Sequence, residues 1–290
     1  MKATAFAPGH ISAFFEPVYF QHDMERTGSR GSGINLSLGV LSEVTVESAS
    51  QQSILVCSNG QVFDAPVTEL AVRYLVGERL LRVVVDTVVD LPVSQGFGMS
   101  AGGALSAALA LGEILGVSRE LVIKAAHFAE VQSRTGLGDV IASSFGGIEI
   151  RREPGLPPWG VLEHIPGKYE VVLCVVGKEV RTKEILSDSA RIPDVAAVGR
   201  QCTKKLLENP SVEHLFEYAQ EFTKRCGFAN KRVSEAIRVA NQYGLASMCM
   251  LGNSVFAIGQ TAKLCTMLSG FGQLYCCTVD EIGARVIRRV

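Results

Sequence analysis

The pattern of apolar and polar positions along this chain of 290 residues predicts different element orders in its two halves. In the first half, β-branched runs predict strands and apolar residues at helical spacing predict helices, with a hairpin turn at Ser58-Asn59-Gly60. The expected strands cover 3–7, 44–47, 54–58 and 80–93, and the expected helices start at Pro66 and cover 100–115 and 119–133. The second half predicts a strand at 171–177, helices at 181–208, 212–226 and 230–243, strands at 246–251 and 255–259, one more helix and a last strand at 274–279.

This order of elements favours an α+β fold with helices on one face of a sheet. The composition changes at residues 152–160, REPGLPPWG, which hold three of the ten prolines. We therefore expect two domains, residues 1–155 and 156–290. Neither an internal repeat nor a low-complexity segment interrupts them.

The stretch 92–111, PVSQGFGMSAGGALSAALAL, is the strongest candidate for a ligand site. Its glycines allow backbone N–H groups to approach a ligand, and the helix that follows adds free N–H groups and the positive end of its dipole. We expect ATP phosphates to bind here, and the alternative is a glycine-rich turn that only packs. The predicted phosphate-binding residues are Gly96, Gly98, Met99, Ser100, Ala101 and Gly102.

Two other nucleotide motifs fit this loop less well. A Walker A loop is excluded because Met99-Ser100 follows Gly98 in place of Lys-Ser/Thr. Gly96, Gly98 and Ala101 match the dinucleotide pattern GxGxxA, which would indicate a nicotinamide-dependent oxidoreductase. That pattern requires a strand after the helix, whereas residues 119–133 predict another helix.

Phosphoryl transfer needs positioning, charge neutralisation and a group that receives or orients the hydroxyl proton. Ser100 offers a hydroxyl ligand for Mg²⁺, Glu130 a carboxylate ligand, and Asp139 a base. Alternatively, Glu130 is a helix residue that faces solvent, and Asp139 only caps a helix.

Arg30 lies in GSRGSG, residues 28–33, which we interpret as a second glycine-rich turn. One arginine on such a turn suggests an acidic substrate, because guanidinium groups bind carboxylates in a bidentate way. The alternative is an arginine that faces solvent. His10 is either a substrate contact or a buried, satisfied histidine, and Arg134 has the same ambiguity.

Charge, hydropathy and cysteine usage limit the partners and the cellular compartment that we expect for this protein. A formal net charge of −1 argues against a bulk nucleic-acid binder. The charge-free windows 91–112 and 239–262 hold too many glycine and polar residues for membrane spans, so no membrane partner is expected. The eight cysteines show no CxxC pair and no zinc spacing, which indicates small buried hydrophobes in a reducing cytoplasm.

Taken in order, these motifs resemble the GHMP kinases. The second motif of that family, Pro-x-x-x-Gly-Leu-Gly-Ser-Ser-Ala, is similar to residues 92–101, with departures at Phe97 and Met99 and with Ser100 retained. Further matches are Glu130 on the following helix, Gly138-Asp139, the pair 146–147 and a thin third motif at 251–255. Five blocks, at 7–15, 28–39, 96–106, 133–140 and 250–257, resemble an archaeal subgroup whose acceptor is a small carboxylic acid with a primary hydroxyl.

The resemblance implies a two-domain GHMP kinase fold, with an N-terminal domain like ribosomal protein S5 domain 2 and a C-terminal ferredoxin-like α/β sandwich. It implies ATP and Mg²⁺ as cofactors and Ser100 and Glu130 on the metal. The predicted catalytic residues are Asp139 and Ser100, with Asp139 as the base or as the group that orients the hydroxyl. The substrate residues that we predict are His10, Ser29, Arg30 and Arg134. The resemblance favours a homodimer. A kinase for another small hydroxy acid or polyol, or a ligand sensor without activity, remains the alternative.

Overall fold

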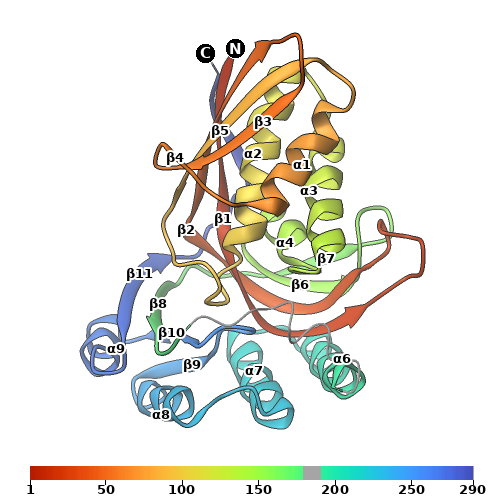
Figure 1. The fold of residues 1–290 in the computed structure, drawn as a ribbon. Helices are drawn as coiled ribbons and strands as arrows, with labels where there is room; N and C mark the ends of the chain where they lie inside the picture. The colour runs from red at the N-terminus through yellow and green to blue at the C-terminus, as the bar shows by residue number, and fades with distance from the viewer. Residues whose placement is uncertain (179–190, 290) are drawn as a thin grey trace.

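A computed structural model describes residues 1–178 and 191–289 and shows two β-sheets with helices packed on them (Figure 1). The larger sheet has eight strands in the order β12-β1-β2-β5-β3-β4, and β6 pairs with β2 and β7. Within the part of the chain that the structure describes, only β3 and β5 pair in parallel. The strands are β1 (Lys2–Val18), β2 (Gly28–Ser48), β3 (Ser53–Ser58), β4 (Gln61–Val62), β5 (Leu81–Val89), β6 (Ile148–Glu153), β7 (Val161–Ile165) and β12 (Arg285–Arg289).

Helices α1 (Pro66–Val76), α2 (Met99–Leu115), α3 (Arg119–Ser133) and α4 (Asp139–Phe145) lie on one face of this sheet (Figure 1). Proline at the first position of α1 needs no N–H partner there, and Ser118 caps α3 by accepting from the backbone N–H of Leu121 at 3.3 Å. Nearly every side chain of α2 is buried, because alanines and glycines let it approach β1 and β2 closely. Ser100, in its first turn, is exposed.

The smaller sheet has four antiparallel strands in the order β11-β8-β10-β9. Its strands are β8 (Glu170–Val175), β9 (Gly244–Met248), β10 (Ser254–Gly259) and β11 (Gln273–Thr278). The helices of this half are α6 (Ile192–Glu208), α7 (Val212–Cys226), α8 (Lys231–Ala240) and α9 (Thr261–Leu268). One hydrophobic core joins the two sheets, since Phe15 of β1 packs on Phe222 of α7 with ring centroids 5.5 Å apart.

Most expected elements are present, and the differences concern the strands. The strand expected at 3–7 continues through Pro8-Gly9-His10 to Val18, and residues 28–33 are the start of β2 and not a turn. The reason is pairing, because these two stretches are hydrogen-bonded to each other along almost their whole length. Residues 181–190 of the expected helix 181–208 lie outside the described residues.

The sheets divide the chain differently from the predicted boundary at residues 155 and 156. β7 pairs with β6, and β12 pairs with β1, so two strands from beyond residue 155 belong to the larger sheet. Both chain ends therefore lie together at one end of this sheet (Figure 1). Within residues 1–178 and 191–289, no helix combines the length and apolar character needed to cross a membrane.

Candidate active site

A cavity of about 320 Å³ lies between the glycine-rich loop, the α3–α4 connection and the β9–β10 turn. Its wall includes the loop from Gly96 to Ala101 and the side chains of Ser29, Glu130 and Asp139. A cavity of this size with a few polar groups on an otherwise apolar wall is typical of a small-molecule site. The residues that we predicted for phosphate, metal and proton transfer therefore line one cavity, apart from Gly102, which packs inside α2 near Val40.

The loop before α2 presents an open helix N-terminus to this cavity. Gly98 is the N-cap residue with φ at +68°, a left-handed conformation that favours glycine, and among the described residues no side chain caps the helix. The N–H groups of the first turn are thus free for a ligand. The backbone N–H of His10 donates to the Phe97 carbonyl at 2.9 Å, which fixes this loop on β1.

Asp139, the first residue of α4, faces the same cavity with a quarter of its side chain exposed. Its Oδ1 lies 2.6 Å from Nδ1 of the buried His10. Burial alone would raise the pKa of Asp139, but the hydrogen bond and charge of His10, helped by the charge of Arg151, lower it below its usual value. Asp139 is therefore an ionised carboxylate that can orient a hydroxyl and accept its proton.

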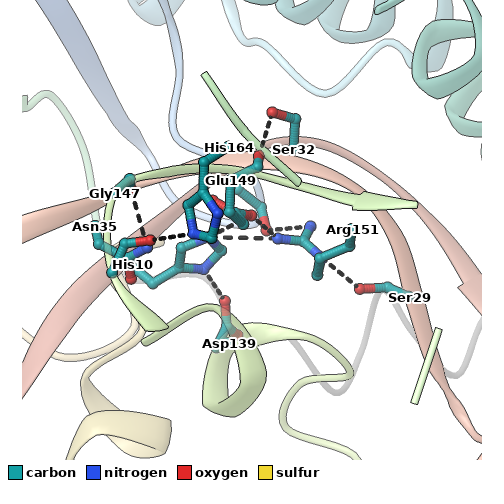
Figure 2. A network of polar contacts seen from close by, with 11 residues as sticks. His10, Ser29, Ser32, Asn35, Asp139, Gly147, Glu149, Arg151 and His164 are labelled. Atoms are coloured by element: carbon teal, nitrogen blue, oxygen red, sulfur yellow. Dashed lines mark hydrogen bonds and ion pairs between the residues drawn. The ribbon is translucent and has the colours of Figure 1, made fainter. Parts of the chain in front are cut away.

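Behind Asp139, charges of opposite sign alternate into the interior (Figure 2). Nε2 of His10 lies 3.1 Å from Oε1 of Glu149, and Arg151 donates to the same oxygen. Arg151 also donates to Ser29 Oγ at 3.2 Å and to Ser12 Oγ at 3.3 Å, and both serines line the cavity. The guanidinium of Arg151 is thus the cation directly behind the cavity wall.

Glu130 of α3 is buried, and its Oε2 has no hydrogen-bond partner among the described residues. Burial raises its pKa well above the usual range, and the neighbouring charge of Asp139 adds to the rise. Gly136 leaves room for this carboxylate, since a Cβ there would overlap Oε1. A cation at this point would offset the burial of the ionised group and give Oε2 a partner.

This donor set fits Mg²⁺. The described residues contain no group of three or more His, Cys, Asp and Glu side chains that could hold a metal. Mg²⁺ usually takes only one or two carboxylates and completes its shell with waters and phosphate oxygens. One buried carboxylate, Glu130, and the exposed Ser100 line the same cavity, which suits that chemistry.

Three predicted substrate residues do not line this cavity. Arg30 is not on the cavity wall, and it pairs with Glu16 at 3.3 Å and with Glu153 at 2.9 Å. Arg134 ends α3 in a left-handed conformation and is exposed outside the cavity. His10 lies behind Asp139 and not on the wall. Of the predicted substrate residues, Ser29 alone reaches the wall.

Sequence reasoning missed Glu149 and Arg151. Both lie in IEIRRE, residues 148–153, which form β6. Two opposite charges at alternate positions of a strand share one face of the sheet. This spacing of the two charges, which alternate with the apolar residues Ile148 and Ile150, was the sequence signal that could have identified them. Both isoleucines are buried in the structure.

The model of the GHMP kinases N terminal domain matches residues 67–147, which include the glycine-rich loop, Glu130 and Asp139. A pantoate kinase of Thermococcus kodakarensis is 36% identical over 270 residues, 89% of this chain and 88% of the relative. A pantoate kinase of Methanocaldococcus jannaschii is 32% identical over 264 residues, 91% of this chain and 95% of the relative.

A solved structure described as a phosphotransferase related to the CoA biosynthesis pathway is 33% identical, with a TM-score of 0.91 and all of both chains covered. The GHMP kinase fold that we expected is thereby confirmed, and so is the narrower likeness of the five sequence blocks to archaeal pantoate kinases. This chain belongs to the pantoate kinase family of the GHMP kinases.

Proposed function

We propose that this protein transfers the γ-phosphoryl group of ATP to the primary hydroxyl of pantoate, which forms 4-phosphopantoate for coenzyme A biosynthesis. One observation carries this function beyond family membership. The uncapped N-terminus of α2, which suits a phosphate, and the carboxylate of Asp139 line the same cavity of about 320 Å³. Donor phosphates and acceptor hydroxyl can therefore meet between them.

The residues of this chain support an in-line transfer. The free N–H groups of the first turn of α2 and the hydroxyl of Ser100 bind donor phosphate oxygens, and Asp139 holds the acceptor hydroxyl by its proton. The hydroxyl oxygen attacks the γ-phosphorus, the bond to ADP breaks, and the hydroxyl proton passes to Asp139. When bound at Glu130 and Ser100, Mg²⁺ supplies neutralisation of phosphate charge.

For the carboxylate of pantoate, Ser29 and Arg151 are better candidates than Arg30. Ser29 lines the cavity and accepts from Arg151, so a carboxylate beside it would meet a hydroxyl donor close to a buried positive charge. Arg30 is engaged with two glutamates away from the cavity wall. We thus keep the prediction of an acidic acceptor, but we assign its carboxylate to the surroundings of Arg151 in place of Arg30.

The test is ADP release by the purified protein with ATP and Mg²⁺ in the presence of pantoate, homoserine, mevalonate, shikimate or galactose, each separately. We expect turnover with pantoate alone. Turnover with another acceptor would keep the kinase and replace its substrate. ATP binding without turnover on any acceptor would favour a ligand sensor. A homodimer and a cytoplasmic location stay predictions, and light scattering after size exclusion tests the first.

A further inference from the structure

Glu149 is buried, does not line the cavity and cannot touch a substrate there, yet it contacts the residue that holds Asp139. We propose that Glu149 is a positioning residue for phosphoryl transfer, because it fixes the His10 ring with Nδ1 directed at the carboxylate that receives the hydroxyl proton. This inference rests on the proposed function and extends it to a residue that acts through two others.

Two carboxylates hold the His10 ring, one at each nitrogen. Its two nitrogens lie within hydrogen-bond distance of two carboxylates, Asp139 at 2.6 Å and Glu149 at 3.1 Å, on opposite sides of the ring (Figure 2). When the ring is protonated, both of its nitrogens donate a hydrogen bond. Each of these hydrogen bonds restricts rotation of the ring away from the other carboxylate. Asp139 then receives a hydrogen bond of fixed direction from a side chain that is itself fully buried.

The strands around Glu149 are built to hold it there. Gly33 is the ladder partner of Glu149, and a Cβ at Gly33 would overlap Nε2 of His10. The hydroxyl of Ser32 donates to the Glu149 carbonyl at 2.6 Å, which fixes the backbone at this residue. A glycine opposite the glutamate thus clears the space in which the imidazole and the carboxylate meet.

The electrostatics agree with this arrangement. The groups that face His10 are Asp139 from α4 and Glu149 and Arg151 from β6. Burial would lower the pKa of His10, but the charge of Glu149 and the hydrogen bonds to Asp139 and Glu149 raise it above its usual value. The three ion pairs Asp139–His10, His10–Glu149 and Glu149–Arg151 each join opposite charges.

The first test is a double-mutant cycle between Glu149 and Asp139, read as kcat at saturating ATP and pantoate. Glu149→Gln keeps the volume and one oxygen, and removes the charge. We expect kcat to fall about 10- to 100-fold in the wild-type background and by less than about threefold in an Asp139→Asn background, because the pathway through Asp139 is already lost. The KM for ATP is expected to stay within about twofold.

The matched control is Glu16→Gln. Glu16 is also a buried glutamate that pairs with arginines, but its partners are Arg30 and Arg200 and it contacts neither His10 nor Asp139. Its kcat is expected to stay within about twofold of wild type. Equal losses of kcat for Glu149→Gln in both backgrounds would overturn the proposal, and so would a loss confined to the KM for pantoate, which would point to Arg151 instead.

A second readout does not need turnover. In protein with isotope-labelled histidine, the signal of His10 is assigned with a His10→Gln variant and titrated by NMR. Glu149→Gln is expected to lower the pKa of His10, and Glu16→Gln to leave it unchanged. An unchanged titration of His10 in Glu149→Gln overturns the inference. Inactivity of the wild-type protein on pantoate would instead overturn the proposed function, while this titration still reports whether Glu149 controls His10.

Discussion

Arg151 and Arg30 lie on neighbouring strands of the larger sheet, and each pairs with glutamates, but only Arg151 contacts side chains that line the cavity. Arg151 is 2% exposed and contacts Glu149, Ser29 and Ser12. Arg30 has a side chain 29% exposed and contacts Glu16 and Glu153. Glu16 also binds Arg200 of α6 at 2.8 Å, so this second cluster connects the larger sheet to the helices of the other half.

The difference follows from alternation along β2. Gly31 is the ladder partner of Arg151, and Ser29, two residues earlier, accepts from that arginine. Arg30 lies between them and therefore projects from the opposite face, where its ladder partner is Glu16. Neighbouring positions along β2 thus face opposite sides of the sheet. One side meets the cation behind the cavity, and the other side carries the cation that connects the larger sheet to the helices of the other half.

The largest expected effect comes from Arg151. Arg151→Gln removes the charge behind the cavity wall and leaves Glu149 with a buried charge that only His10 offsets. We expect kcat/KM for pantoate to fall about 100- to 1000-fold, and the free energy of unfolding to fall by about 3–5 kcal/mol. Steady-state kinetics and urea unfolding measure the two quantities.

If Arg151→Gln proves too unstable to assay, Arg151→Lys keeps the charge and the fold. Its point charge cannot reproduce the contacts to both serines, so we expect it to retain stability but to lose part of the affinity for pantoate. An unchanged kcat/KM in both variants would remove Arg151 from the site.

A smaller effect is expected for Ser29, which lies between the arginine and the cavity. Ser29→Ala removes a hydroxyl that accepts from Arg151 at 3.2 Å. A hydrogen bond to a charged group is worth about 1.5–3 kcal/mol, so kcat/KM for pantoate should fall about 10-fold or more. The matched control is Ser32→Ala. The buried hydroxyl of Ser32 donates to the Glu149 carbonyl, and its removal should leave the KM for pantoate nearly unchanged.

A still smaller effect is expected for Arg30. Arg30→Gln leaves Glu16 paired with Arg200, so the cluster keeps one of its two cations. We expect kcat/KM for pantoate to stay within about threefold, and the free energy of unfolding to fall by about 1 kcal/mol, as for other partly exposed pairs. A large rise in the KM for pantoate would restore Arg30 as the carboxylate contact and contradict the comparison.

The last prediction uses pH, since only the Arg151 cluster contains a histidine. The pKa of His10 is raised in the folded protein, so its contribution to stability is complete below pH 6.5 and is lost as pH rises through the folded pKa. His10→Gln should flatten the loss of stability above pH 6.5 in urea unfolding, and Arg30→Gln should leave that slope unchanged. The pKa of the buried His127 is lowered, so its contribution is lost below pH 6.5 and does not overlap this window.

Elements that depend on consecutive residues were predictable. The helix expected at 119–133 is α3 with the same bounds, the helix expected at 212–226 is α7, and the turn at Ser58-Asn59-Gly60 joins β3 to β4. Capping residues, turn residues and helical spacing act over a few positions, so they are readable in the sequence. The positions of Ser100, Glu130 and Asp139 on one cavity followed from the family resemblance and the order of motifs.

By itself, the sequence determined the family, the helices and the glycine-rich loop before α2, because these are encoded in short contiguous patterns. Only the tertiary structure decided that residues 28–33 are a strand, that β12 completes the larger sheet beside β1, and that Arg151 and not Arg30 lies behind the cavity. His10 and Glu149 are 139 positions apart. Their contact depends on the register of three paired strands, and a register is a property of long-range hydrogen bonding that no local pattern contains.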